Sequence, residues 1–317
     1  MLLIANSFCA IAQEKSPETI VLDSYRDTLK SIIKNLYAAK ADSVKHKYNE
    51  QLLTTFNRVL KMQGSFAYPF DSISDIGILN SPDYLIRIFN WNVPLTNGTH
   101  EYYGFIQAKQ IQIKKVGLFK KTFIESYKIF PLKDISATVK NPENYSGDNN
   151  KWFGMLYYSI IPKKVKNKKI YYTLLGWDGN DKFSNKKIID ALTFDNKGVP
   201  QFGATIFNTT KGAKKRVIFE YNANCTMSLK YNKAKDSIIF DHLVPSETQL
   251  EGQYQYYCTD FTYDGFGFKN GKWNYGEFVN ATNEKNQKDA IYKNPEDTRN
   301  AIRSNEIINK KIKVKKK

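Results

Sequence analysis

Residues 152–276 contain five short runs rich in aromatic and β-branched side chains: YYTLLGW (171–177), KIIDALTF (187–194), KRVIFEY (215–221), DSIIFDHLV (236–244) and QYYCTDFTY (255–263). Clusters of Asp, Asn, Gly and Lys separate these runs, for example DGND (178–181) and NKAK (232–235). Such runs between turn clusters predict consecutive antiparallel strands. We therefore expect a mainly β fold, α+β overall, in which an antiparallel meander forms a sandwich, a barrel or a propeller-like body.

The segment that precedes the β region has a helical periodicity. Within residues 13–65, apolar side chains recur at spacings of three and four, which predicts amphipathic helices. Two arrangements fit this pattern: two helices that break near Asp42–His46, or one continuous helix. We expect residues 65–69 to act as a linker to the β domain.

The β domain is expected to span residues 66–276. Its first hairpin joins residues 82–91 to residues 101–107 around the tight turn Asn97-Gly98. Residues 109–135 are expected to add two or three weaker strands. The remaining residues, 277–317, are rich in Lys and poor in aromatic residues, and are expected to be partly helical or disordered.

The N-terminus indicates export. Residues 1–12 (MLLIANSFCAIA) are apolar and end in Ala10-Ile11-Ala12, which is typical of the remnant of a signal peptide and its cleavage site. The expected location is the periplasm or the extracellular space. No later run reaches the roughly 18 apolar residues that a transmembrane helix needs. Cys225 and Cys258 then form an even pair, either bridged as a disulfide or buried as two separate thiols.

The chain carries a net charge of +17, and 42 of its 48 basic residues are Lys. Sequence-specific readers of nucleic acid rely on Arg for bidentate contacts, and no nucleic-acid-binding motif accompanies these lysines, so a specific nucleic-acid partner is not expected. A Lys-rich solvated surface explains most of the charge. If the charge has a partner, an exported protein would find it in an acidic envelope component or a polyanionic glycan.

The most concentrated polar group is Trp177-Asp178-Gly179-Asn180-Asp181. Its oxygen atoms are suitable calcium ligands, but Lys182 and the missing downstream Glu break the calcium-loop pattern. The sequence favours a β-turn in which Gly179 has a positive φ, Asp178 caps the backbone and Trp177 packs below. Trp177, Asp178, Asn180 and Asp181 remain candidate ligand-binding residues.

Weak candidates for catalysis are acidic residues and one histidine in the predicted strands: Asp190, Glu220, Asp241, His242 and Asp260. A glycoside hydrolase uses two facing carboxylates, often beside aromatic rings that stack on the sugar. Tyr263, Asp264 and Trp273 are further candidate ligand-binding residues. Strand alternation places Ile238, Phe240, His242 and Val244 on one face, and Asp241 and Leu243 on the other. Arg216 is available as an ion-pair partner for Asp190 or Glu220. No metal site or cofactor is expected, because the chain has three His and no complete metal, nucleotide or hydrolase motif.

The ordered segments YYTLLGWDGND, KKIIDALTFD, PQFGATIF, KRVIFEY, MSLKY, IIFDHL and YDGFGFKNGKW resemble a family of exported Bacteroidota proteins without an assigned activity. The resemblance covers roughly residues 82–275. It implies an exported protein with a β-rich body, and it implies no catalytic residues.

We therefore expect an exported binding or envelope-associated module, without catalytic activity, for a glycan, a peptide or an acidic envelope component. The alternative is a secreted carbohydrate-active hydrolase that uses paired carboxylates. Two carboxylates roughly 5 to 9.5 Å apart in an open aromatic cleft would favour hydrolysis, whereas carboxylates scattered or paired with Lys and Arg would favour binding. A third alternative, a structural component, predicts the largest apolar patch on the N-terminal helices.

Overall fold

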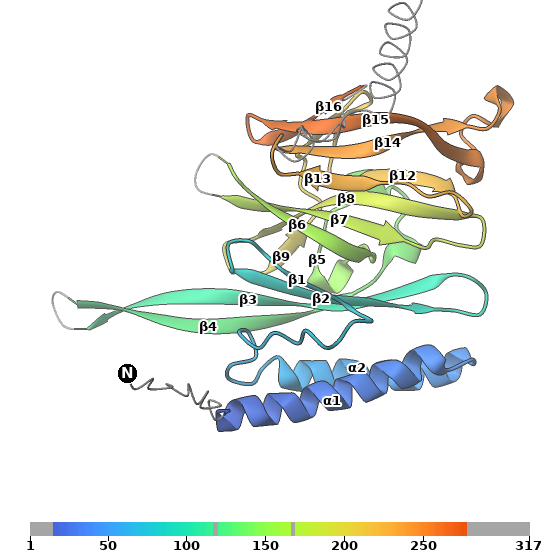
Figure 1. Ribbon diagram of the computed structural model, residues 1–317. Coiled ribbons are helices and arrows are strands. Elements are labelled where there is room, and N and C mark those ends of the chain that lie inside the picture. The colour runs from blue at the N-terminus through green and yellow to red at the C-terminus, as the bar shows by residue number, and fades with distance from the viewer. Residues whose placement is uncertain (1–14, 117–119, 166–168, 278–317) are drawn as a thin grey trace, which may run out of the picture. The chain divides into compact units, whose positions relative to one another are not determined.

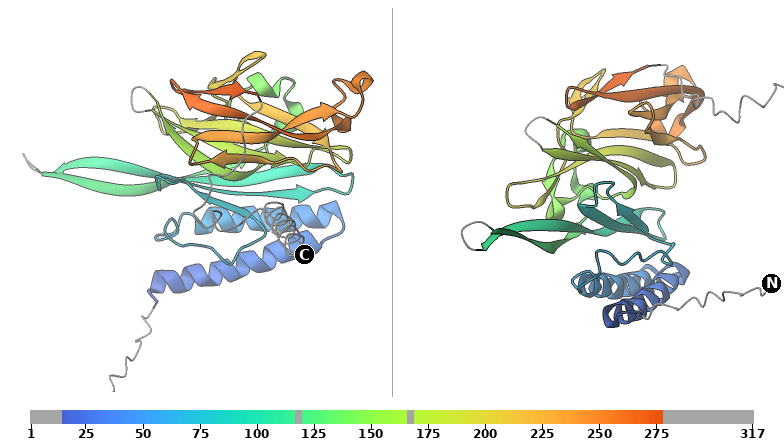
Figure 2. Two further views of the ribbon diagram at one scale, coloured as in Figure 1. Left: turned by 45° about the horizontal axis from the view of Figure 1, so that its top comes forward. Right: turned by 60° about the vertical axis from the view of Figure 1, so that its left-hand side comes forward.

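The computed structural model describes residues 15–116, 120–165 and 169–277, with the side chains of residues 111–124 excepted. The described residues form four stacked layers, one of helices and three of sheets (Figures 1 and 2). The helical layer contains α1 (Pro17–Ala38) and α2 (Asp42–Val59). The predicted signal peptide, and the predicted tail beyond Glu277, lie outside the described residues.

The three sheets are open and antiparallel, with one exception described below. The first sheet has the order β1 (Gly77–Asn80), β2 (Ile86–Pro94), β3 (His100–Val116), β4 (Lys120–Lys133). The middle sheet has the order β5 (Gly147–Asp148), β9 (Pro200–Phe202), β8 (Ser184–Phe194), β7 (Ile170–Asp178), β6 (Leu156–Lys164), and β12 (Val217–Asn222) also pairs with β8. The third sheet has the order β11 (Gly212–Lys214), β10 (Phe207–Thr209), β16 (Lys272–Gly276), β15 (Tyr257–Lys269), β14 (Ser237–Pro245), β13 (Leu229–Asn232). Short 3-10 helices connect them: η1 (Ser136–Thr138), η2 (Pro142–Asn144), η3 (Asn149–Lys151), η5 (Thr248–Leu250) and η6 (Tyr254–Tyr256).

The predicted fold class is confirmed: two helices precede a mainly antiparallel β body. The sheets stack as in a sandwich, and the described strands close no barrel. Residues 109–135 contribute two strands, the second half of β3 and the whole of β4, which pair from Tyr103–Lys133 to Val116–Lys120 as one long hairpin. One pair departs from the antiparallel pattern: β10 and β16 are parallel.

Strand alternation explains why the layers stack. In β2, Ile86 and Ile88 face the middle sheet, whereas Phe89 and Trp91 face the helices. The same division occurs in the middle sheet, where Ile188 packs toward the first sheet and Ile189 toward the third. A strand covered on both faces needs apolar side chains at successive positions, which is why the run 187–194 has the adjacent apolar pairs Ile188-Ile189 and Ala191-Leu192.

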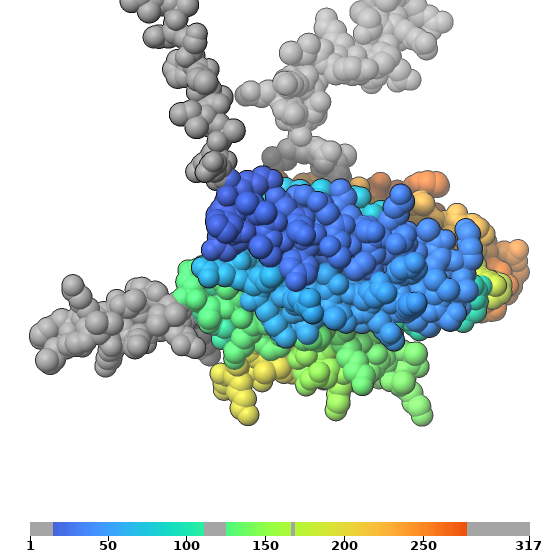
Figure 3. Space-filling model, turned by 90° about the horizontal axis from the view of Figure 1, so that it is seen from below, coloured from blue at the N-terminus to red at the C-terminus, as the bar shows by residue number. Residues whose placement is uncertain are grey.

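The two helices are separate, so the first of the two predicted arrangements is confirmed. Ser16 caps α1 by accepting a hydrogen bond from the backbone N–H of Thr19 at 3.3 Å, and Pro17 occupies the first turn. α1 ends at Ala38, and α2 begins at Asp42. Their buried apolar residues pack against the first sheet, and the two helices cover that side of the molecule (Figure 3). Asn49 of α2 accepts a hydrogen bond of 2.7 Å from the indole of Trp91.

The predicted linker at residues 65–69 is wrong, because this connection is packed into the core. The guanidinium of Arg87, almost completely buried, donates hydrogen bonds to the carbonyl oxygens of Tyr68 and Pro69, each at 2.6 Å, and to those of Ser65 and Phe66 at 3.3 Å. The helical segment and the first sheet therefore share one core, and no domain boundary separates them at residue 65.

Candidate functional site

The Trp177–Asp181 group is a structural turn between β7 and β8 of the middle sheet, and a hydrogen bond from Tyr102 to Asp178 ties it to the first sheet. Asp178 is buried, and its Oδ1 accepts hydrogen bonds from the Tyr102 hydroxyl at 2.7 Å and from the backbone N–H of Asn180 at 2.8 Å. The predicted positive φ at Gly179 is wrong: Asn180 has the positive φ, of 41°. Gly179 is needed for a different reason, since a Cβ there would collide with the imidazole of His100.

The pH dependence of stability can test how much Tyr102 stabilises this turn. Burial, with a further contribution from Asp178, raises the pKa of the Tyr102 hydroxyl above its usual value. An acid with a raised folded pKa contributes stability that is complete below its unfolded pKa, about 10, and declines at higher pH. Tyr102→Phe should lose about 2 kcal/mol at pH 8, because Asp178 and the N–H of Gly179 lose a partner. At pH 11 the difference from the wild-type protein should be smaller by about 1 kcal/mol. Urea denaturation at both pH values measures it, and an equal difference at both would contradict the role of Tyr102.

Asp190 lies in the core and is not available to a ligand. Its side chain is fully buried, and Nη2 of the equally buried Arg216 donates to both carboxylate oxygens, at 3.0 and 2.9 Å. The hydroxyl of Tyr157 donates to the same carboxylate at 3.1 Å. The prediction that Arg216 pairs with a strand carboxylate is confirmed. The prediction that Asp190 is a catalytic group is wrong, because the core encloses it.

Asp241 and His242 lie at an irregularity in the third sheet. The pairing of β14 with β15 passes from Asp241–Tyr263 to Leu243–Thr259, so His242 alone faces three residues of β15. Beyond this bulge the predicted alternation fails, because Leu243 rather than Val244 packs against the core. Asp241 accepts a hydrogen bond from the backbone N–H of Ser228 at 2.8 Å. The two side chains form no dyad with each other in the described structure, as the alternation predicted.

His242 instead meets Asp264 of the neighbouring strand. Its Nδ1 lies 2.7 Å from Oδ2 of Asp264, and the hydroxyl of Tyr275 donates to the same oxygen at 2.7 Å. Asp264 is buried, so its predicted direct contact with a ligand is wrong. The arrangement fixes Tyr275, whose ring forms part of the cleft described below.

The remaining candidates also have partners of their own. Glu220 accepts a hydrogen bond of 2.6 Å from Ser184 and lies 3.7 Å from the ammonium of Lys186. Asp260 is exposed, and hydrogen bonds from Thr262 hold its pKa below the usual value. The five candidate catalytic residues therefore bond to separate partners.

The aromatic candidates divide by burial. Trp273 is fully buried between the middle and third sheets, where its indole donates to Thr173 at 2.8 Å, so its predicted role as a ligand platform is wrong. Trp177 is half-buried and makes an edge contact with the ring of His100. Tyr263 is exposed, as are Asp181 and its neighbour Phe183. Of the predicted ligand-binding aromatics, Tyr263 is the most accessible.

The structure contains a cleft that the sequence did not indicate, here called the basic cleft. It has a volume of about 470 Å³ and lies between β12, η2 and the β10–β11 and β16 edge of the third sheet. Its lining combines lysines with aromatic rings and hydroxyls, among them Lys140, Lys186, Lys211, Lys214, Thr209, Thr210, Phe219, Tyr254 and Tyr275. These residues come from six elements along the chain, and in the sequence the lysines are indistinguishable from the many others.

The charges in the basic cleft are unbalanced. Two of its lysines are paired with its two glutamates: Lys214 lies 2.9 Å from Glu143, and Lys186 lies 3.7 Å from Glu220. Lys140 and Lys211 are exposed, and neither forms an ion pair with any residue that the structure describes. The cleft therefore has a positive excess that suits an anionic ligand.

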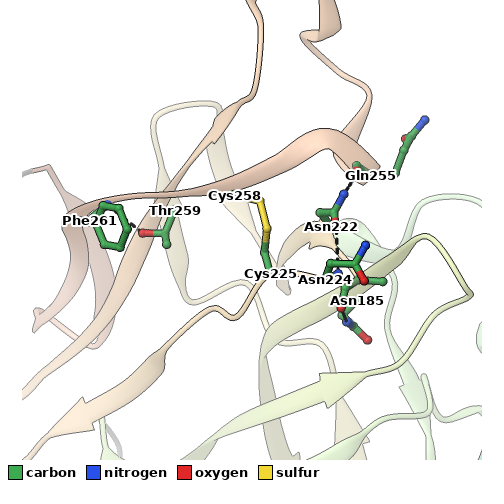
Figure 4. Close-up of a disulfide and its surroundings, with 9 residues drawn as sticks. Asn185, Asn222, Asn224, Cys225, Gln255, Cys258, Thr259 and Phe261 are labelled. Atoms are coloured by element: carbon green, nitrogen blue, oxygen red, sulfur yellow. Dashed lines mark hydrogen bonds between the residues drawn. A yellow bond between two sulfur atoms is a disulfide. The ribbon is translucent and has the colours of Figure 1, made fainter.

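Cys225 and Cys258 form a disulfide, with their Cα atoms 5.9 Å apart (Figure 4). The bridge connects the segment after β12 in the middle sheet to the start of β15 in the third. Next to it, Asn222 donates a hydrogen bond of 2.6 Å to the carbonyl of Gln255. Of the two alternatives for this cysteine pair, the structure has the bridged one.

Comparison with known protein families, curated proteins and solved structures finds no match for this chain. Within the described ranges, no group of three or more His, Cys, Asp or Glu side chains is placed to hold a metal ion. Neither α1, α2 nor any other helix of the described residues is both long and apolar enough to cross a membrane. The function is therefore argued from the basic cleft and its surroundings.

Proposed function

We propose that this protein is an exported, non-catalytic binding module that holds an acidic saccharide in the basic cleft. The observation that carries the proposal is the pair Lys140 and Lys211, two exposed cations at a cleft whose glutamates are already paired with other lysines. A cleft of about 470 Å³ is within the usual size range of small-ligand sites.

The other lining groups favour a saccharide over other anions. Lys acts as a point charge that attracts carboxylate and phosphate alike, so the lysines set the sign of the ligand and the neighbouring groups set its class. The rings of Tyr254 and Tyr275 offer apolar faces with a polar edge, and Thr209 and Thr210 add hydroxyls. Carboxylates, ring faces and hydroxyls of an acidic sugar all find partners in this set.

The arrangement of the acidic residues supports binding over hydrolysis. A glycoside hydrolase needs two carboxyl groups that face each other across the scissile bond. Asp190 is buried against Arg216, Asp241 is bonded to the backbone of Ser228, and Glu220 is paired with Lys186. Carboxylates engaged separately in this way are those we expected of a binding protein.

Export to the periplasm or beyond is part of the proposal, as is the resemblance to exported Bacteroidota proteins. The disulfide between Cys225 and Cys258 supports export, because such bridges persist mainly in oxidising compartments. The apolar run before Gln13, with its Ala-Ile-Ala site, supports it independently.

Calorimetric titration with hexagalacturonic acid tests the proposal. We expect the wild-type protein to bind this carboxylated hexasaccharide, and the double variant Lys140→Glu/Lys211→Glu to bind it roughly tenfold more weakly or worse. The matched control is Lys30→Glu/Lys34→Glu, which changes the net charge equally at exposed positions of α1. This control should bind as the wild-type protein does.

Two further readouts separate the alternatives. Cellohexaose, which has no charge, should not compete with hexagalacturonic acid. If both double variants bind hexagalacturonic acid equally weakly, the interaction depends only on net charge. If the wild-type protein does not bind it, acidic saccharides are not the ligand. Release of new reducing ends during the titration would show hydrolysis and contradict a non-catalytic role.

A further inference from the structure

A second surface has the opposite chemistry to the basic cleft. It lies on the β14–β15 hairpin and carries three exposed aromatic side chains together with three exposed carboxylates: Tyr256, Phe261, Tyr263, Glu247, Glu251 and Asp260. We call this set the hairpin surface. Most aromatic residues of the third sheet are buried or packed against the core between the layers, so this group is an exception that needs an explanation.

Phe261 is the most exposed large apolar side chain of the described residues, at 86%. It lies in the middle of the three residues of β15 that face His242, and has a φ of 67°. The bulge is held by its neighbours: Thr259 Oγ1 accepts a hydrogen bond from the N–H of Phe261, and Asp260 Oδ1 accepts one from the N–H of Thr262, both at 3.0 Å. A fixed backbone thus presents an aromatic ring to solvent rather than to the core.

The base of the hairpin surface is anchored to the middle sheet. The disulfide of Cys258 lies three residues before Phe261, and Asn222 binds the carbonyl of Gln255 (Figure 4). A surface held in place before binding loses less conformational entropy when a partner docks. The anchor therefore favours recognition by rigid aromatic groups.

The local charge identifies the partner. Residues 236–268 contain six acidic residues and no Lys or Arg, in a chain that has 48 basic residues. With His242 neutral, this stretch carries −6, and since the whole chain carries +17, the remaining residues carry +23. Asp236 of this stretch pairs with Lys163, and Asp264 lies against His242, which leaves Glu247, Glu251 and Asp260 as its exposed carboxylates. Exposed carboxylates and ring faces attract Lys and Arg side chains, through ion pairs and cation–π contacts, and repel anionic ligands.

We propose that the hairpin surface docks a cationic polypeptide segment, with Phe261 as its apolar anchor. The exposed carboxylates pair with Lys or Arg side chains of the partner, and an apolar residue between those cations packs on the Phe261 ring. This interaction is independent of the basic cleft, whose positive excess would repel the same segment.

The probe is the synthetic peptide (Lys-Leu)₄, compared with (Glu-Leu)₄ and with cellohexaose, by calorimetric titration of the full chain. We expect (Lys-Leu)₄ to bind the wild-type protein, and we expect any binding of (Glu-Leu)₄ to be lost in Lys140→Glu/Lys211→Glu and kept in Phe261→Gly. Phe261→Gly should weaken this binding roughly tenfold or more. Its melting temperature should stay unchanged or rise, because glycine adopts a positive φ without strain and the ring contributes little packing. The matched control is Tyr84→Gly, another exposed aromatic at positive φ, 74% exposed with a φ of 55°, which should not change binding.

The outcomes are distinct. Binding of (Glu-Leu)₄ that is weakened in Phe261→Gly, no binding of (Lys-Leu)₄, or unchanged binding of (Lys-Leu)₄ by Phe261→Gly would overturn the proposal. Binding of cellohexaose that is lost in Phe261→Gly would identify a sugar platform and also overturn it. A lower melting temperature of Phe261→Gly would show that the ring serves the fold. Phe261→Gly should still bind hexagalacturonic acid, and Lys140→Glu/Lys211→Glu should still bind (Lys-Leu)₄, so each proposal can fail alone.

Discussion

Asp190→Asn is expected to lower the free energy of unfolding by about 3–5 kcal/mol, because it leaves a buried cation without its counter-charge. The Arg216 guanidinium has no exposed atoms through which water can replace the carboxylate. Its other described contacts are one hydrogen bond of 2.8 Å to the carbonyl of Pro142 and the ring of Phe153, 4.6 Å away. Its Nε has no hydrogen-bond partner in the described structure, so the site has no spare acceptor. Urea denaturation followed by tryptophan fluorescence measures the loss.

The control for this prediction is Glu220→Gln, which removes a carboxylate from an ion pair of the same sheet. Glu220 and Lys186 are partly exposed, so solvent screens their interaction, and the loss should be about 1 kcal/mol. A second control is the double variant Asp190→Leu/Arg216→Met, which removes both charges and should recover much of the stability lost by Asp190→Asn. If Asp190→Asn and Glu220→Gln lose equal stability, Asp190 does not neutralise Arg216 in the way we describe.

The strands could be predicted from sequence because their signal is local. The run 187–194 became β8, and the turn at Asn97-Gly98 joined β2 to β3, since composition and turn residues act over a few positions. The parallel pairing of β10 with β16 was missed because their pairing residues, Phe207 and Trp273, lie far apart in the chain. Periodicity gives the faces of a strand but not its neighbour.

The functional surfaces were harder to predict than the strands. The run 255–263 was correctly assigned to the β body, but alternation gives no sign that Phe261 leaves the regular register. That departure depends on how β15 pairs with β14 around His242. The basic cleft has the same origin, because Lys140 and Lys211 belong to separate loops that only the stacking of sheets brings to one cavity. Conversely, Trp273 and Asp190 have side chains suited to binding or catalysis, but the stacking of the layers buries them, and the sequence does not show that burial.

The second large effect is expected for Arg87→Met, which should lower the free energy of unfolding by about 3 kcal/mol. Burial lowers the pKa of Arg87 to about 10, which shows that folding disfavours the charged form of this side chain. The hydrogen bonds to the 65–69 connection must outweigh that penalty, and the two to Tyr68 and Pro69, at 2.6 Å, are the shortest. The guanidinium also lies 4.9 Å from the ring centre of Phe89. Methionine fills a similar volume but leaves these carbonyls without a donor.

Arg87→Met should loosen the 65–69 connection locally as well as lower the global free energy of unfolding. Because Arg87 holds the connection between α2 and the first sheet, we expect faster tryptic cleavage after Lys61, an exposed residue just past the end of α2. Arg26→Met is the matched control: Arg26 lies near the same connection and pairs with Asp23, but it is partly exposed, so its loss should be about 1 kcal/mol or less. Arg87→Lys retains the charge without the fork and should fall between the two. Cleavage after Lys61 at the wild-type rate in Arg87→Met would show that the connection is held by its apolar contacts instead, with Phe70 and Tyr68 sufficient to keep it in the core.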